Sequence, residues 1–521
     1  MRLTNLLLAS LLCTAACSSP TPTPVEITSA TMIDKVRGAW AGKMIGVMYG
    51  RPMEFQVTDR MYTDSIIWQP ENVTASLNED DIYGQMNFMA TMQRLGQDAP
   101  TDSLARYFAE AEFGLCHANL QARKNYFDGL RGLDLSSPQN SIHCEDIDFQ
   151  IECDFIGFVN PGMPQSASAM CDRVGRVMAA ADGLYAGIYV STLHSLSYLS
   201  NDINKTVRDA LQSIPADAPY SLCIRDVIAA YEADSTDWTK CWHAINDKWN
   251  EHDVCTPYHT FNIDAKLNGA YVVMGLLYGH GDLKKTMDIT VGCGQDTDCN
   301  TATAAAVLCL MSGYDAIPDI FKSHIPAISD EKFLFTDYSF NDAVDVTLEF
   351  IAENVVAGGG QYLPDSLYKI IPQSIKTAPY EPGLAYLRVA DMVQITDSTR
   401  WQLSGNWVPF VYGAGDDAPY RVATTPGDSA TIEFEGTGIA LLGSWNTDGG
   451  RAIVQIDDLT PKTVDTYYVT EAGKFEGNRA YVFYMTDLDD GKHTLTLTVL
   501  PESAPASTGY KIYLERALIY K

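Results

Sequence analysis

The spacing of apolar residues changes once along the chain, near Pro379, and the change divides the sequence into two kinds of structure. From about residue 28 to 375, apolar residues recur every three or four positions, which is the period of an amphipathic helix. After Pro379, short alternating runs such as ATIEFEG and KHTLTLTVL are separated by Gly, Asp, Asn and Pro, as in antiparallel strands. We therefore expect an all-α domain over residues 30–376, followed by an antiparallel β-sandwich or jelly roll over residues 380–521.

A row of glycines marks the first long helix. Gly38, Gly42, Gly46 and Gly50 fall every fourth residue and so share one face of that helix. Because glycine lowers helix stability, four in one row indicate a requirement for space. We expect another helix to pack very close to this face, or a site to need it.

The chain is strongly acidic. Its 66 Asp and Glu residues against 36 Lys and Arg residues give a formal net charge of −30. Nucleic acid and anionic lipid surfaces are also negative, so this charge argues against both as partners. The length of 521 residues and the 46% hydrophobic content allow a large core. These features leave the oligomeric state open.

Residues 1–17 have the pattern of a targeting segment. Arg2 precedes a short apolar run, and the small residues before Cys17 resemble a bacterial lipoprotein signal, in which Cys17 becomes the lipidated N-terminus. Residues 18–29 then predict an extended tether rich in Pro, Ser and Thr. We expect an exported lipoprotein, periplasmic or on the cell surface, that contacts the membrane only through its lipid anchor. Cleavage by an ordinary signal peptidase is the alternative, because Thr14 departs from the usual Leu.

The cysteines and histidines show no metal-binding spacing. Ten cysteines remain beyond Cys13 and Cys17, without a CxxC pair, and several lie in apolar runs. For an exported protein we expect buried thiols together with one or two disulfide bridges. The histidines without ligand spacing to one another or to cysteine are His117, His143, His243, His252 and His259.

Two acidic clusters stand at the starts of apolar helices. Asp296 and Asp298 follow a Gly-containing turn and open an Ala-rich helix, and the run Glu79-Asp80-Asp81 precedes another helix. Carboxylates this close together at an irregular helix start suit a hard cation such as Mg²⁺, which takes oxygen ligands. The alternative is that they are solvated helix caps that complement the helix dipole.

The blocks around these clusters resemble the signatures of the ADP-ribosylglycohydrolase family. They read GAWAGKMIGVMYGRPMEF (38–55), EDDIYGQMNFM (79–89) and GQDTDCNTATAAAVLCLMSGYDAIP (294–318). The stretch IDFQIECDFIGFVNPGMP (147–164) is similar to an exported bacterial branch of that family. The resemblance covers about residues 30–340 and implies an all-α bundle with a Mg²⁺ centre, or Mn²⁺ in some members. It also implies a hydrolase that cleaves a glycosidic bond at a ribosyl-type anomeric carbon.

The resemblance assigns roles to particular residues. It implies that four aspartates ligate metal: Asp80, Asp81, Asp296 and Asp298. Glu79 stands in place of the family's Thr and still offers oxygen, whereas Cys299 replaces another Thr with a thiol, a poor ligand for a hard cation. One or two metal ions are therefore both open.

Other polar residues are candidates for the reaction and for substrate contacts. Glu54 matches the acid that the family places beside the metals and implicates in activating water, the alternative being an ordinary surface Glu. Asn125 and Asp154 are candidate substrate contacts. Asp154 belongs to an acidic run with Asp146, Asp148 and Glu152, for which solvated or capping roles are the favoured interpretation.

The sequence leaves three alternatives for the substrate and the function. The family implies ADP-ribose linked to a protein or small molecule, and Arg37, Lys43 and Arg51 are the candidate partners for a pyrophosphate. Export and the appended β domain, which loosely resembles galactose-binding-like modules, indicate instead a pentose-containing glycan or a nucleoside-like glycoside. A catalytically decayed, glycan-binding surface lipoprotein is a third alternative.

Aromatic residues of the β domain carry the carbohydrate-binding hypothesis. Such rings stack on sugars in binding modules, but they also fill cores and domain contacts. The candidates are Trp401, Trp407, Trp445, Tyr467 and Tyr468.

Overall fold

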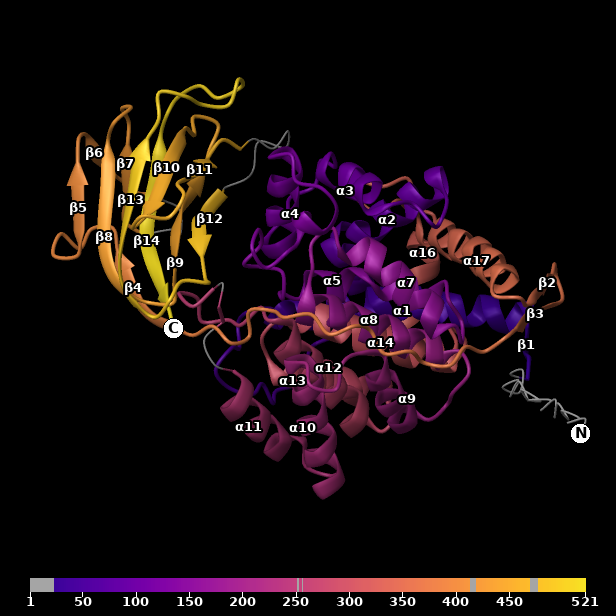
Figure 1. Ribbon diagram of the computed structural model, residues 1–521. Helices are drawn as coiled ribbons and strands as arrows, with labels where there is room; N and C mark the ends of the chain where they lie inside the picture. The colour runs from indigo at the N-terminus through magenta and orange to yellow at the C-terminus, as the bar shows by residue number, and fades with distance from the viewer. Residues whose placement is uncertain (1–22, 251–252, 255, 413–417, 469–476) are drawn as a thin grey trace, which may run out of the picture.

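The chain forms a helical domain followed by a β domain, as the change in hydrophobic period predicts (Figure 1). The computed structural model describes residues 23–250, 253–254, 256–412, 418–468 and 477–521. The targeting segment with Cys17, part of the tether and His252 lie outside these residues. Within the described part of the chain, none of the helices has the length and apolar character that crossing a bilayer requires.

Helices occupy most of the chain up to residue 357. The α-helices are α1 (Ser29–Gly50), α2 (Asp80–Leu95), α3 (Thr101–Ala109), α4 (His117–Phe127), α5 (Asp148–Glu152), α6 (Asp154–Phe158), α7 (Pro164–Gly175), α8 (Ala181–Ser197), α9 (Ile203–Ala210), α10 (Pro219–Ala233), α11 (Trp238–Trp249), α12 (Ala265–Gly279), α13 (Leu283–Cys293), α14 (Thr297–Ser312), α15 (Asp319–Lys322), α16 (Ile325–Ile328) and α17 (Phe340–Ala357). Short 3₁₀ helices are η1 (Arg51–Met53), η2 (Pro70–Asn78), η3 (Gly132–Leu135) and η4 (Leu211–Ser213).

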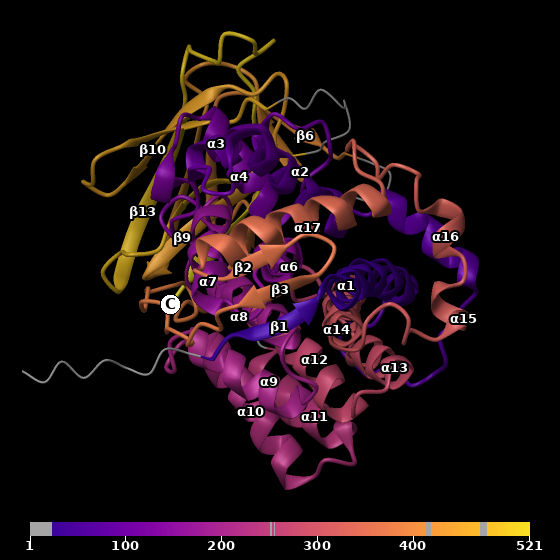
Figure 2. The same ribbon diagram turned by 90° about the vertical axis from the view of Figure 1, so that its right-hand side faces the viewer.

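The glycine row of α1 is a close contact with α14, and the two helices lie side by side at the centre of the domain (Figure 2). A methyl carbon added to each glycine would lie 2.3 Å (Gly38, Cys309), 2.7 Å (Gly42, Ala305), 2.4 Å (Gly46, Thr301) and 2.1 Å (Gly50, Thr297) from the carbonyl oxygen of the facing α14 residue. The facing residue number falls by four as the glycine number rises by four, so the helices run antiparallel. The close packing expected of this row is confirmed.

A small three-stranded sheet lies at one end of the helical domain, where only helices were expected (Figure 2). Its strands are β1 (Val25–Thr28), β2 (Gln361–Leu363) and β3 (Leu367–Ile370), in the order β1-β3-β2. The antiparallel pair of β1 with β3 buries Ile27 and Ile370. The segment just before α1 is thereby paired with the segment that follows α17.

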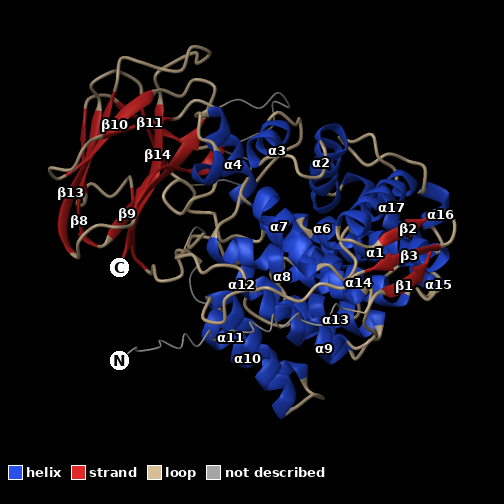
Figure 3. Cartoon of the chain, turned by 45° about the vertical axis from the view of Figure 1, so that its right-hand side comes forward, coloured by secondary structure: helices blue, strands red, loops and turns tan. Residues whose placement is uncertain are grey.

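The β domain consists of two antiparallel sheets (Figure 3). Its strands are β4 (Val389–Gln394), β5 (Trp401–Ser404), β6 (Trp407–Phe410), β7 (Tyr420–Ala423), β8 (Ser429–Gly436), β9 (Gly438–Trp445), β10 (Arg451–Ile456), β11 (Lys462–Asp465), β12 (Gly477–Met485), β13 (Gly491–Val499) and β14 (Ile512–Tyr520). One sheet has the order β11-β10-β13-β8-β5; the other has the order β12-β9-β14-β7-β6, with β4 also paired to β14. Alternate residues of both sheets, such as Ile432, Leu497 and Leu441, meet in one core.

The second sheet also presents an apolar face to the helical domain. Leu442, Tyr481 and Leu518 belong to one buried cluster with Ile147 and Ile263. Strand β9 is consequently buried along its whole length, on both faces. Hydrogen bonds cross the same junction, including one from the Tyr484 hydroxyl to the Pro138 carbonyl oxygen at 2.9 Å.

Several aromatic candidates for sugar stacking are buried. Trp401 lies in the core between the two sheets and is 3% exposed. Trp445 and Tyr468 are each 4% exposed and pack with Leu120 of α4. These three rings are covered by protein, whereas Trp407 and Tyr467 are half-buried. The covered rings build the core and the domain junction, the other role that the sequence allowed.

No disulfide bridge joins two of the described cysteines, so the expected bridges are absent among these residues. Eight of these nine residues are buried, and Cys116 is exposed. Most of these thiols fill apolar positions within helices, as Cys309 does in α14, in line with the expectation of buried thiols. Cys255 lies outside the described residues.

Candidate metal centre and pocket

The glycine contact brings the end of α1 to the start of α14. The Thr297 hydroxyl donates a hydrogen bond to the Gly50 carbonyl oxygen at 2.8 Å. Helix η1 follows directly, and the Phe55 amide then donates to the Gln295 carbonyl oxygen at 3.0 Å. Glu54 is held between these two attachments, so its carboxylate lies beside those of Asp296 and Asp298.

The turn before α14 is irregular and is held by side-chain hydrogen bonds. Gly294 and Gln295 both have positive φ angles, of 83° and 63°. Such a conformation is unfavourable for a residue with a side chain, but the Gln295 amide nitrogen donates to the Thr58 carbonyl oxygen at 2.8 Å. Its amide oxygen accepts from the Asn262 backbone at 2.8 Å. The turn places Asp296 at the helix N-cap.

The carboxylates converge in two overlapping groups. One ligand atom from each of Glu54, Asp296 and Asp298 lies within 4.8 Å of the others, and so do atoms of Asp81, Asp298 and Cys299. Asp298 is shared by both groups. The three aspartates are nearly inaccessible, and Glu54 is half-buried. The structure thus brings together residues from the three sequence blocks.

The carboxylates repel one another in this buried setting. Burial, with Asp298 adding, raises the pKa of Glu54 to about 7, although Arg51 opposes the shift. Burial also raises the pKa of Asp296 to about 7. Burial and the neighbouring Asp296 raise the pKa of Asp298 well above its ordinary value. Among the described residues, no Lys or Arg forms an ion pair with these three carboxylates.

The donor atoms fit a hard cation. Asp296 Oδ1 and Asp81 Oδ2 are buried without a hydrogen-bond partner, and such oxygens are costly unless a proton or a cation satisfies them. The group of Glu54, Asp296 and Asp298 offers only carboxylate oxygens, which Mg²⁺ prefers. The other group includes Cys299, whose thiol pKa is raised well above its ordinary value by burial and the nearby acids. A neutral thiol is a poor ligand for Mg²⁺.

A buried lysine, Lys43, forms ion pairs with two aspartates, one of which belongs to the centre. Lys43 Nζ lies 3.2 Å from Asp81 Oδ1 and 2.6 Å from Asp154 Oδ2, and it donates to the Ile151 carbonyl oxygen at 3.0 Å. Asp154 also lies 2.7 Å from His194 Nε2. Although burial acts in the opposite direction, Lys43 and His194 hold the pKa of Asp154 below its ordinary value.

The two residues predicted to contact substrate are directed elsewhere. Asp154 is fully buried in the Lys43 and His194 network. Asn125 is 4% exposed, and its amide nitrogen bridges the carbonyl oxygens of Leu135 and Asn140. Neither residue lines the pocket beside the carboxylates. Their positions favour structural roles over substrate contact.

The remaining residues of the acidic blocks take separate positions. Glu79 forms an ion pair with Arg51 and stands outside the two converging groups. Burial, partly offset by Arg51, raises the pKa of Glu79 to about 7. Asp80 is exposed and lines the pocket next to Tyr83. The Arg51 guanidinium is therefore engaged in an ion pair with Glu79.

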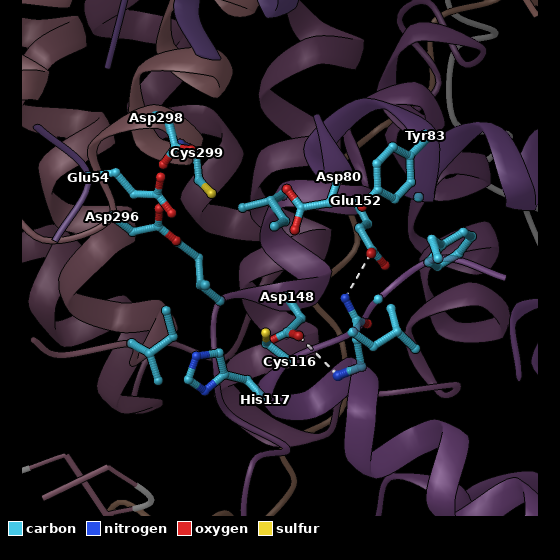
Figure 4. A pocket seen from close by; sticks show the side chains of 18 of the residues that line it. Glu54, Asp80, Tyr83, Cys116, His117, Asp148, Glu152, Asp296, Asp298 and Cys299 are labelled. Carbon is cyan, nitrogen blue, oxygen red and sulfur yellow. Dashed lines mark hydrogen bonds between the residues drawn. The ribbon is translucent and has the colours of Figure 1, made fainter. Parts of the chain in front are cut away.

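The pocket has a second polar wall that the sequence interpretation missed. Figure 4 shows Glu54, Asp296, Asp298 and Cys299 on one side, with Asp148 and Glu152 away from them on another side. Asp148 and Glu152 were expected to be solvated, but they are only 5% and 3% exposed. Their spacing of four residues within the 147–164 block places them on one face of a helical turn. That spacing was the signal available in the sequence.

His117, His143 and Asp146 also meet, although their sequence spacing does not suggest it. Asp146 Oδ2 lies 2.6 Å from His143 Nδ1 and 3.8 Å from His117 Nδ1. Burial lowers the pKa of His117 to about 4 and that of His143 to about 3, so both rings are neutral at pH 7. His117 lines the pocket, and His143 contacts the Tyr481 ring of the β domain.

Comparison with known proteins bears on the helical domain. The ADP-ribosylglycohydrolase family model matches residues 28–344. A solved structure titled "ADP-ribosylglycohydrolase-related protein complex" is 14% identical, with 62% of this chain and 99% of that chain covered and a TM-score of 0.42. No curated protein matches the chain significantly.

Carbohydrate-active proteins also share limited structural likeness with the chain. A family two carbohydrate esterase from Cellvibrio japonicus is 15% identical, with 26% of this chain and 34% of that chain covered and a TM-score of 0.19. A two-domain esterase active on acetylated mannans is 13% identical, with coverages of 38% and 53% and a TM-score of 0.21.

The family match confirms the resemblance carried by the three sequence blocks. It spans more than half of the chain and contains Glu54, both acidic clusters and the pocket. Membership implies a hydrolase of ADP-ribosyl-type glycosidic bonds, in a family that is typically metal-dependent. The chain belongs to the ADP-ribosylglycohydrolase family.

Proposed function

We propose that this chain is a Mg²⁺-dependent hydrolase that cleaves a glycosidic bond at a ribosyl-type anomeric carbon, with Mn²⁺ as an alternative ion. The observation that carries the proposal is the convergence of Glu54, Asp296 and Asp298, buried or half-buried and without an ion-pair partner among the described residues. Asp81 would hold the opposite side of the centre. One ion fits between Asp296 and Asp298, with Glu54 beside it as the base and not as a ligand, and a second ion would have to accept Cys299 as a neighbour.

A bound divalent cation supplies Lewis-acid polarisation and a template for sugar hydroxyls. The aspartates hold the charge that binds it, and Lys43 fixes Asp81 and Asp154 behind it. Glu54 differs from Asp81, Asp296 and Asp298 because it is half-buried and lines the pocket. It is therefore placed to accept a proton from the attacking water, as a general base must be.

Metal binding tests the proposal directly. Asp296→Asn together with Asp298→Asn removes two charges while keeping the size of both side chains, so the fold should persist. Calorimetry with Mg²⁺ and Mn²⁺ should show binding to the wild type and loss of binding in the double variant. Hydrolysis of ribosyl-type glycosides should be lost with it. A double variant that binds either ion as tightly as the wild type would overturn the proposed centre.

We also propose that the protein is exported and held at a membrane by lipid on Cys17. The support is the sequence pattern of residues 1–17, since these residues lie outside the described structure. Mass spectrometry of the mature N-terminus tests this, with Cys17→Ser as the control variant. An unmodified N-terminus that begins at another residue would refute it.

A further inference from the structure

The pocket wall away from the metal carboxylates is built from α4 and α5. Asp148 Oδ1 accepts a hydrogen bond from the Asn119 backbone amide at 3.0 Å. Glu152 Oε1 accepts from the Asn119 side-chain amide at 2.8 Å. Asn119 therefore positions both acids, and all three residues line the pocket. Figure 4 shows the two acids, Asp148 and Glu152. The sub-site formed by Asn119, Asp148 and Glu152 is called the acceptor wall below.

The acceptor wall has three oxygens that remain unused. Asp148 Oδ2, Glu152 Oε2 and Asn119 Oδ1 are buried and have no hydrogen-bond partner. A buried acceptor left unsatisfied costs free energy, and a ligand that donates hydrogen bonds to it recovers that cost. Asp148 and Glu152 belong to neither of the converging groups near Glu54, so a cation shared with that centre does not account for them. Hydroxyl groups are the donors that suit such a wall.

Apolar and aromatic side chains complete the surroundings of the acceptor wall. Tyr83 and Phe113 line the same pocket, and their ring centroids are 5.1 Å apart. Ile147 and Ile151 add aliphatic surface. A sugar ring has hydroxyl groups at its edge and C–H groups on its faces, so it matches a pocket that combines acceptors with aromatic rings.

The pocket lacks the charge that would hold a phosphate. Its described lining includes six carboxylic acids and His117, but no Lys or Arg. The basic residues considered for a pyrophosphate are engaged elsewhere: Lys43 is fully buried with Asp81 and Asp154, and Arg51 pairs with Glu79. Arg37 lies over the rings of Tyr314 and Phe340. Apart from a bound metal ion, the side chains of this pocket therefore meet an anionic ligand with like charges, which repel it.

We propose that the acceptor wall binds the hydroxyls of an uncharged sugar, and that the substrate is a phosphate-free pentofuranoside in preference to an ADP-ribosyl compound. This rests on the proposed function, because the sugar would lie between the acceptor wall and the metal carboxylates. Burial raises the pKa of Glu152 well above its ordinary value, with Asp148 adding, and burial raises the pKa of Asp148 to about 7. A proton held by this pair lets the wall donate one hydrogen bond while it accepts others.

Binding measurements with defined probes test the acceptor wall. Methyl ribofuranoside, methyl arabinofuranoside and ADP-ribose are titrated into the Mg²⁺-loaded protein by calorimetry or ligand-observed NMR. We expect at least one methyl furanoside to bind more tightly than ADP-ribose. Asp148→Asn and Glu152→Gln should each weaken it about 10–100-fold, the usual cost of leaving a buried hydrogen-bond donor without its acceptor. Glu112→Gln, an exposed acid outside the pocket, is the charge-matched control and should bind normally.

Deoxy analogues separate direct contact from a structural effect. If Glu152 contacts a hydroxyl, the 2-, 3- or 5-deoxy furanoside that lacks it should bind the wild type weakly, and Glu152→Gln should add little further loss. Normal Mg²⁺ affinity in each variant shows that the metal centre is intact. Tighter binding of ADP-ribose, normal furanoside binding in both variants, or binding of no probe overturns the inference. If the wild type itself does not bind Mg²⁺, the proposed function is overturned instead.

Discussion

Replacing Gly50 with Ala should weaken metal binding, whereas the same change at Gly38 should not. Gly50 has φ −80° and ψ −32°, which alanine adopts readily, so the effect is steric and not conformational. The added methyl carbon would lie 2.1 Å from the Thr297 carbonyl oxygen and 2.6 Å from the Asp298 Cα. Ordinary contacts are about 3.5 Å or longer, so α1 and α14 must separate by about 1.4 Å at this point.

The change in stability should be modest. Overpacking of this kind costs about 1–3 kcal/mol, and the higher helix propensity of alanine returns up to about 1 kcal/mol. We expect a net loss of about 0–3 kcal/mol in the free energy of unfolding for either variant. At Gly38 the methyl carbon would lie 2.3 Å from the Cys309 carbonyl oxygen, a clash of similar severity. Twelve residues at 1.5 Å each place Gly38 about 18 Å from Gly50 along the helix.

The two variants should therefore separate stability from ligand geometry. In Gly50→Ala the displaced Asp296 and Asp298 no longer converge with Asp81, and Mg²⁺ affinity should fall about 10–100-fold, as when a metal site loses its supporting contacts. In Gly38→Ala the affinity should remain at the wild-type value. Calorimetry with Mg²⁺ and thermal unfolding of the metal-free proteins measure the two effects. Equal affinity in both variants would refute the reasoning that the glycine contact positions the centre.

Three further changes test Glu54 as the general base, the titration of the buried Asp296, and the junction between the two domains. Glu54→Gln should retain metal binding while turnover falls by about two to four decades, the usual contribution of a general base; lost metal affinity would identify Glu54 as a ligand. Burial raises the pKa of Asp296 from 3.8 to about 7. Between these pH values the folded metal-free protein binds a proton that the unfolded chain has released. The stability that this proton contributes is therefore present below about pH 4 and is lost as the pH rises through 7. The stability of the wild type relative to Asp296→Asn should thus fall over that range, and added Mg²⁺ should reverse the trend above pH 7; a difference that does not vary with pH in chemical denaturation would contradict it. Residues 380–521 expressed alone should self-associate, because the face with Leu442 and Leu518 is no longer covered by the helical domain. Leu442→Lys in this fragment should restore a monomer in sedimentation. A monomeric wild-type fragment would show that the face tolerates water.

The positions of the charged residues show why burial changes an interpretation based on sequence. Asp148 and Glu152 were interpreted as solvated or capping acids, because nothing in the sequence fixes their geometry and Asp and Glu are mostly exposed. In the structure they face a pocket and share Asn119, which comes from a different helix. Asp154, from the same run, points the other way and pairs with Lys43. Neighbouring residues of one short segment thus serve a pocket wall and a buried ion network.

The sequence alone determined the features that depend on local pattern. The two hydrophobic periods divide the chain into helical and β parts, the acidic blocks mark two helix starts, and the four-residue glycine spacing requires a close neighbour, because periodicity and helix geometry act over a few residues. Only the tertiary structure decided which helix meets the glycines, which acids share a pocket, and which aromatic rings are covered. These outcomes depend on contacts between segments far apart in the chain, such as Gly50 with Thr297 and Asn119 with Glu152. Local residue patterns do not encode such pairings, because they follow from how all the apolar faces pack together.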